Sequence, residues 1–153
     1  MMRIEDEIKT TKFQSEIQKA HLNVIFSAGW VRARINNSLK PFGLTLEQLN
    51  VLRIVRGKHP DGIRVKDITN RMLDRSSNTT RIIDRLVEKG LTLRLSSDRD
   101  GRERAIILTA NGYDMLQDIE MAWETDTPHI ARITAEEALL LSDLLDKLRA
   151  EID

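Results

Sequence analysis

The chain has 153 residues, which suffices for one compact domain with additional helices but not for two full domains. Hydrophobic residues make up 41% of the sequence and charged residues 31%, a balance that excludes a disordered or membrane-embedded class. The chain has no cysteine, so disulfides, thiolate zinc sites and thiol-based redox sensing are excluded as well.

The first residues of the chain carry several acidic side chains and no continuous apolar run. We therefore expect neither a secretory signal nor a membrane span. The expected location is cytoplasmic, and no membrane partner is expected.

The charges are balanced overall but unevenly distributed, with 24 basic and 24 acidic residues. The segment from Arg64 to Arg104 carries eleven basic and seven acidic residues, a net charge of +4, and the remainder carries −4. A local positive field on an acidic body suits binding to nucleic-acid phosphates. A solvated surface of mixed charge is the alternative interpretation of this segment.

The first predicted element is a long amphipathic helix over residues 10–40, which ends at Pro41. Its apolar residues recur every three or four positions: Phe13, Ile17, Ala20, Val24, Ala28, Val31, Ile35 and Leu39. Thr45 and Gln48 have the spacing of a capping box, so they predict the start of a second helix that runs to Gly57.

A turn at residues 59–62 and a short strand at 63–65 precede a third predicted helix, whose inward face carries Val65, Ile68 and Met72. The chain then turns around Ser76 and restarts as a fourth helix that Gly90 ends. We expect Ser76 or Ser77 to cap this helix.

The fourth helix has two distinct faces at about 100° per residue. The inward face is predicted to hold Thr79, Ile82, Ile83 and Leu86. The exposed leading turn is predicted to hold Ser77, Asn78, Thr80 and Arg81.

Two strands follow at residues 91–95 and 104–108, joined around an Asp-Gly turn into a basic hairpin. Thr109 is expected to cap a fifth helix that ends before Pro128. A capping box at Thr134 and Glu137 predicts the last helix.

These elements predict a mainly α fold with a small β-hairpin, a winged helix-turn-helix. The DNA-binding lobe is expected over 44–108, with an N-terminal dimerisation helix in 1–43 and C-terminal dimerisation helices in 109–153. Apolar stripes on the terminal helices need a partner surface, for which a second copy of the chain is the best fit. A monomer whose terminal helices cover its own core is the alternative.

Four segments occur in the order and spacing of a known family. They are Gly43-Leu44-Thr45, the run from Thr79 to Leu91, Asp100-Gly101-Arg102, and Leu108-Thr109-Ala110-Asn111-Gly112. Over nearly its whole length the sequence resembles the MarR family of bacterial transcriptional regulators.

The resemblance implies a homodimer on a pseudo-palindromic operator. We expect this homodimer to be a repressor, with an activator as the alternative. Each fourth helix would enter a major groove and each wing a minor groove, with half-sites about 34–36 Å apart. The implied DNA contacts are Ser76, Ser77, Asn78, Thr80, Arg81, Arg85, Arg99 and Arg102. Asp100 would hold the Arg102 guanidinium in place.

Two alternatives compete with DNA binding. Arg81 and Arg85 could pair with Asp84 and Glu88 along a solvated helix. The lobe could also be a protein-interaction module, but such a surface should carry aromatic or aliphatic anchors, and the leading turn of the fourth helix carries Ser, Asn, Thr and Arg.

In the family, small aromatic or phenolic anions bind between the dimerisation helices and the lobe. Here the first helix could line such a pocket with Val24, Phe26, Trp30 or Arg34, helped by the second and fifth helices, although core packing would explain the two aromatic residues equally well. The three histidines are far apart, so no metal site is expected. The sequence shows no motif of an enzyme or of a cofactor site.

Overall fold

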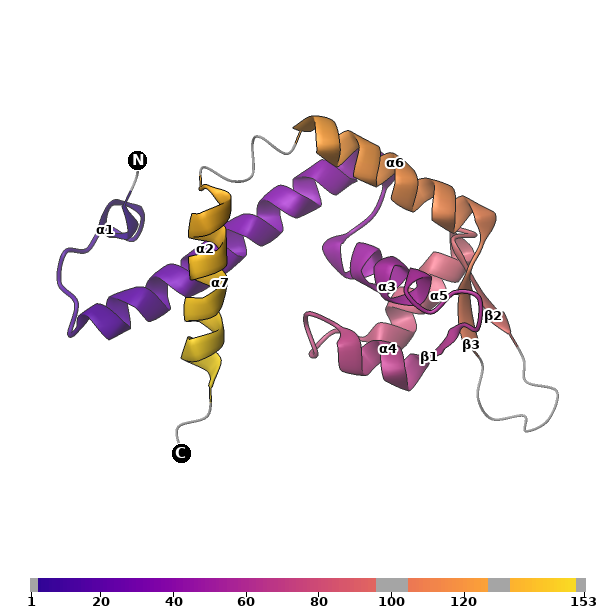
Figure 1. The fold of residues 1–153 in the computed structure, drawn as a ribbon, viewed down its shortest axis with the longest axis horizontal. Coiled ribbons are helices and arrows are strands. Elements are labelled where there is room, and N and C mark those ends of the chain that lie inside the picture. Colours follow the sequence, from indigo (N-terminus) through magenta and orange to yellow (C-terminus); the bar gives the residue numbers. More distant parts are fainter. Residues whose placement is uncertain (1–2, 96–104, 127–132, 151–153) are drawn as a thin grey trace. The chain divides into compact units, whose positions relative to one another are not determined.

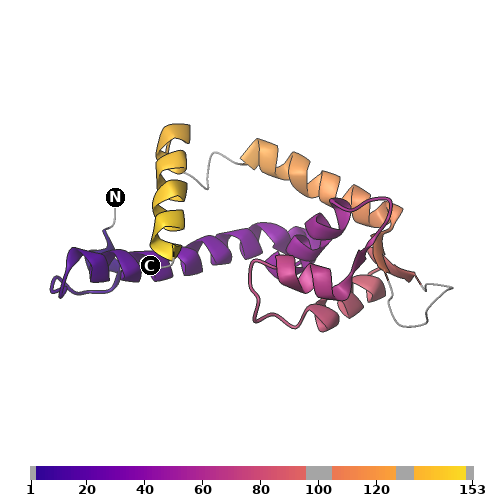
Figure 2. The same cartoon turned by 60° about the horizontal axis from the view of Figure 1, so that its bottom comes forward.

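The computed structural model describes residues 3–95, 105–126 and 133–150. The chain forms two compact units, Met1–Ile119 and Glu120–Asp153. In the first unit the short strands lie at the end away from the N-terminal helix (Figures 1 and 2). The fold is mainly helical with one small antiparallel sheet, as predicted.

The first unit opens with α1 (Ile4–Glu7) and the long helix α2 (Glu16–Leu39). The predicted helix over 10–40 therefore exists but begins six residues later. Ser15 sets the start, because its side chain accepts a hydrogen bond from the backbone N–H of Gln18 at 3.1 Å. Before it, Lys9 has a positive φ of 53° that no helix continues through.

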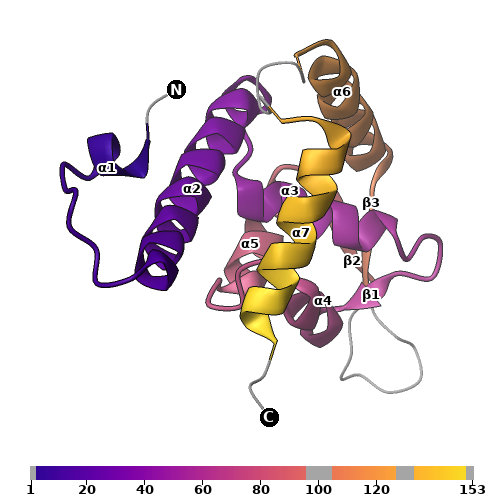
Figure 3. The ribbon, with the colours of Figure 1, turned by 60° about the vertical axis from the view of Figure 1, so that its left-hand side comes forward.

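The end of α2 passes into the 3-10 helix η1 (Lys40–Phe42) and then into α3 (Leu46–Arg56) (Figure 3). The predicted capping box is confirmed: Gln48 N–H donates to Thr45 Oγ1 at 3.3 Å, and Thr45 N–H donates to Gln48 Oε1 at 3.1 Å. Asn36 of α2 adds a third bond, since its Oδ1 accepts from Leu46 N–H at 2.8 Å. The junction of α2 and α3 is therefore fixed by side chains from both helices.

The sheet has three antiparallel strands in the order β1 (Ile63–Arg64), β3 (Ala105–Leu108) and β2 (Thr92–Leu95). The predicted hairpin strands are confirmed, and each begins one residue later than expected. The short strand expected at 63–65 also exists, and it pairs with β3 through Ile63 and Ile106. Alternation along β3 buries Ile106 and Leu108 against the helices.

Two helices lie between β1 and β2 in the chain, α4 (Val65–Arg71) and α5 (Thr79–Glu88). The expectation that Ser76 or Ser77 caps α5 is wrong. Asn78 is the cap, and its Oδ1 accepts from the backbone N–H of Arg81 at 3.1 Å. Thr79 is buried, as predicted, and Gly90 follows the helix with a left-handed φ of 68°.

The core of the first unit is aliphatic and joins α3, α4, α5, the sheet and the start of α6 (Ala110–Asp126). Its most deeply buried side chains include Leu49, Leu52, Ile68, Ile83, Leu86, Ile106, Leu116 and Ile119. This core holds the lobe together, so the polar face of α5 does not have to pack against the rest of the protein.

The second unit contains α7 (Ala135–Arg149). The predicted capping box is confirmed, with Glu137 N–H donating to Thr134 Oγ1 at 3.2 Å and Thr134 N–H to Glu137 Oε2 at 2.7 Å. No residue of α7 is buried. Within the described ranges, no helix is both long enough and apolar enough to span a membrane.

Candidate DNA-binding site

The leading turn of α5 presents polar side chains on a fixed backbone. The Asn78 cap orders the first turn, and Thr80, Arg81 and Arg85 are exposed beyond it. Ser77 is half-buried. The start of a helix also carries partial positive charge from its free N–H groups, which favours an anionic partner.

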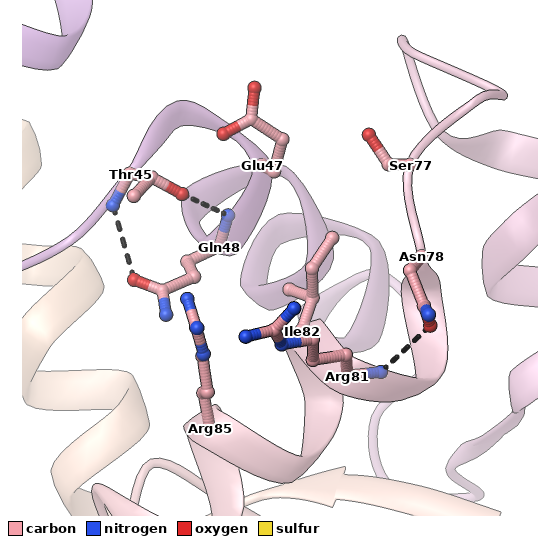
Figure 4. A pocket seen from close by; sticks show the side chains of 8 residues that line it. All are labelled: Thr45, Glu47, Gln48, Ser77, Asn78, Arg81, Ile82 and Arg85. Carbon is pink, nitrogen blue, oxygen red and sulfur yellow. Dashed lines mark hydrogen bonds between the residues drawn. The ribbon is translucent and has the colours of Figure 1, made fainter.

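Between this turn and the start of α3 lies a hollow of about 260 Å³ (Figure 4). We call it the α3–α5 hollow. It is lined by Thr45, Glu47, Gln48, Ser77, Asn78, Arg81, Ile82 and Arg85. Four of the predicted DNA contacts, Ser77, Asn78, Arg81 and Arg85, therefore meet at one place on the surface.

Hydrogen-bond donors that have no partner among the described residues face the α3–α5 hollow. Gln48 is only 5% exposed, its Oε1 is taken by Thr45 N–H, and its amide nitrogen has no partner among the described residues. Arg81 and Arg85 likewise form no ion pair with any residue that the structure describes. Figure 4 shows both arginines reaching from α5 toward Gln48. Such a set of donors matches phosphate oxygens or the acceptor atoms of base edges.

The alternative in which Arg81 and Arg85 pair along their own helix is wrong for this structure. Asp84 instead forms an ion pair with Arg94 of β2, with an N–O distance of 2.5 Å. This contact joins α5 to the base of the wing.

Ser76 lies in the turn before α5 and is held by Asp74. Both its hydroxyl and its backbone N–H donate to Asp74 Oδ1, at 2.6 and 3.0 Å. These two bonds, helped by Arg32, lower the pKa of the Asp74 carboxyl below its ordinary value. The Ser76 side chain thus stabilises the turn, and it does not line the α3–α5 hollow.

The predicted wing contacts Arg99 and Arg102, and the supporting Asp100, lie outside the described residues. The strands on either side of that segment in the chain, β2 and β3, pair with each other and are described.

Two of the four predicted ligand-pocket residues share a cavity. Phe26 and Trp30 line a space of about 200 Å³ together with Ile4, Glu7, Asn23 and Ser27. Its walls come from α1 and α2, not from the second and fifth predicted helices. Val24 does not line it, and the Arg34 guanidinium lies 5.1 Å from the centre of the Trp30 ring. No cluster of three potential metal ligands occurs in the described part of the chain.

Sequence reasoning found the Thr45–Gln48 capping box but did not place it at the site. Gln48 belongs there because α3 and α5 pack together, which brings residues about 30 or more positions apart around one hollow.

Comparison with known proteins agrees with this geometry. Residues 44–103 match the model of the MarR family. The fold is similar to that of a cysteine-to-serine mutant of MarR from E. coli complexed with operator DNA, with a TM-score of 0.77 and 24% identity over 92% of this chain and 100% of that one.

Two further structures are similar in fold. The S. aureus MepR–DNA complex has a TM-score of 0.70 and 20% identity, covering 90% of this chain and 97% of that one. CouR from Rhodococcus jostii RHA1 bound to p-coumaroyl-CoA has a TM-score of 0.71 and 20% identity, covering 92% and 100%. Residues 44–103 are thus similar to the MarR family, and the chain has the winged-helix fold of these MarR-family structures.

Proposed function

We propose that this protein is a sequence-specific DNA-binding repressor that acts as a homodimer on a pseudo-palindromic operator. The observation that carries the proposal is the α3–α5 hollow, where Arg81, Arg85 and Gln48 present donors without partners among the described residues. Two of the structurally similar proteins are themselves DNA complexes, which supports the same assignment.

Within this proposal α5 enters the major groove and its residues have different roles. Arg81 lies on the leading turn and reads a base edge or binds the adjacent phosphate, with Asn78 and Thr80 beside it. Arg85 lies one turn further along and binds phosphate. Ser76 acts through the turn that it shares with Asp74, and Ser77 lies at the rim of the hollow.

The wing completes the interface in this proposal. Arg102 enters the minor groove, Asp100 holds its guanidinium, and Arg99 contacts phosphate. The ion pair between Arg94 and Asp84 supports this arrangement because it ties the base of the wing to the recognition helix.

The dimer is proposed from the surfaces of the terminal helices. Side chains at residues 21–34 of α2 are all exposed in the single chain, including Ile25 at 69%. A long helix gains most of its stability from packing an apolar face, so this face requires a partner. The same holds for α7, where the exposed apolar residues are Leu139, Leu140, Leu141, Leu144 and Leu148. A two-fold dimer would cover both sets with a second copy.

A small aromatic or phenolic ligand is proposed to release the protein from DNA. CouR is a structure of similar fold that binds p-coumaroyl-CoA, and in this chain Phe26 and Trp30 border a cavity on α2. A ligand that prefers the form unable to bind DNA would shift the population away from the operator.

Selection of duplexes from a random pool tests the proposed function. We expect enrichment of one inverted-repeat sequence and binding to it about 10³-fold or more tighter than to unrelated duplex. Equal affinity for all duplexes would contradict sequence-specific regulation. Absence of binding to any duplex at low salt would favour a protein-interaction module instead.

A further inference from the structure

One arginine of the long helix reaches two separate elements of the lobe. The Nη1 of Arg32 in α2 forms a close ion pair with the Glu47 carboxylate at the start of α3. Its Nη2 lies 3.4 Å from Oδ2 of Asp74, which stands in the turn between α4 and α5. Arg32 and Asp74 are 42 positions apart in the sequence.

The turn that receives Arg32 is the segment from which α5 starts. While Asp74 Oδ2 faces Arg32, its Oδ1 accepts two hydrogen bonds from Ser76. Asn50 of α3 holds the same turn from another side, since its Oδ1 accepts from Leu73 N–H at 2.9 Å. Two residues after Ser76, Asn78 caps α5 and fixes the backbone of Arg81.

We propose that Arg32 is a positioning residue that couples α2 to the leading turn of α5, so that the orientation of α2 sets where Arg81 meets DNA. The inference rests on the proposed function, because its consequence is measured on DNA binding. A guanidinium suits this role because its planar fork can hold two carboxylates in fixed directions.

Two features distinguish a positioning role from a role in folding stability or in direct phosphate binding. The side chains of Arg32, Glu47 and Asp74 are 45%, 24% and 34% exposed, and ion pairs this exposed contribute little to folding stability. The three charges sum to −1, so the cluster is not itself a phosphate-binding site. Its contribution is therefore expected in the placement of the turn.

The test compares Arg32→Gln with Lys40→Gln, which removes one positive charge from the residue just after α2 without touching the cluster. We expect Arg32→Gln to weaken binding to the selected duplex by about threefold to thirtyfold, while Lys40→Gln stays near the parent. The slope of log K against log [salt] should stay unchanged in Arg32→Gln, because no phosphate contact is lost.

A second readout does not involve DNA. In the free protein, amide hydrogen exchange at Ser76 and Ser77 should accelerate in Arg32→Gln and in Asp74→Asn, and the double variant should add little to either one. This measurement also separates a local change in the turn from global unfolding.

The possible results distinguish the positioning role of Arg32 from the proposed function. Parental affinity and parental amide exchange in Arg32→Gln, in a protein that does bind DNA, would overturn the positioning role and leave the proposed function standing. A salt slope reduced by about 1 would also overturn it, because Arg32 would then be a direct phosphate contact. Failure of the parent protein to bind any duplex would overturn the proposed function and this inference with it.

Discussion

The backbone carbonyl of Leu91 lies where a side chain on Gly112 would have to stand. Leu91 lies in the segment after α5, and Gly112 lies in the first turn of α6, so that segment and the start of α6 approach each other here at backbone distance. Thr109 closes the same contact: its N–H donates to Leu91 O at 3.1 Å and its hydroxyl to Gly90 O at 2.7 Å. This close approach gives a physical reason for the Leu-Thr-x-x-Gly motif.

Replacement of Gly112 by Ala should therefore destabilise the protein by about 1–3 kcal/mol, because the new methyl group would collide with backbone that cannot rotate away. Urea unfolding measures the effect. Gly57→Ala is the matched control, since a Cβ there meets its nearest neighbour at 3.6 Å, an ordinary contact. Equal stability of the two variants would contradict the close approach.

Asn78→Ala should lower the free energy of unfolding by about 0.5–2 kcal/mol, because the N–H of Arg81 loses its acceptor at the start of α5. Ser77→Ala, one residue earlier, should leave thermal stability near the parental value. Asn78→Asp should retain most of the parental stability, since a carboxylate can also accept the hydrogen bond that caps α5. If Ser77→Ala were the more damaging change, the cap assignment would be refuted.

Asp74 should make stability depend on pH in a defined direction. Its hydrogen bonds from Ser76, and secondarily Arg32, lower the pKa of the folded-state carboxyl below the ordinary 3.8. The folded state therefore favours the charged form. This contribution is present above the ordinary pKa and is lost as the pH falls through the lowered value.

Urea unfolding of the parent and of Asp74→Asn over a pH series measures this dependence. The stability difference between them should be largest near neutral pH and should shrink under acid conditions. A difference that grows on acidification would contradict the role of Asp74 as an anchored carboxylate.

Leu144→Glu should convert the proposed dimer to monomer, because it places a charge in the apolar stripe of α7, where Leu144 is 55% exposed in the single chain. Analytical ultracentrifugation measures the mass. Asp143→Lys changes the charge at the neighbouring position, which is already polar, and should remain dimeric. A parent protein that sediments as a monomer would refute the dimer.

Short-range signals in the sequence predicted much of the fold. The Thr45–Gln48 and Thr134–Glu137 boxes, the burial of Thr79 and the hairpin strands were all predictable, because capping and alternation act between residues close in the chain. The start of α5 was not. The Ser76 hydroxyl donates a hydrogen bond to Asp74 in the preceding turn, so Asn78 caps α5 in its place.

The candidate site was predictable in its helix but not in its surroundings. The exposed face of α5 follows from helical periodicity, which placed Arg81 and Arg85 on the surface. The contribution of Gln48 and the contact between Arg32 and Asp74 depend on how α2, α3 and α5 pack. Contacts over such sequence separations carry no local pattern.

The salt dependence of DNA binding by Arg81→Gln tests the central claim most directly. Arg81→Gln should bind the selected duplex about tenfold or more weakly than the parent does. Lys58→Gln serves as the control, because it removes a positive charge just after the far end of α3, and it should bind like the parent. If Arg81 contacts phosphate, its salt slope should fall by about 1. If Arg81 reads a base, the ratio of affinities for duplexes that differ at the contacted base pair should decrease instead. Parental affinity, salt slope and discrimination in Arg81→Gln would contradict DNA recognition by α5.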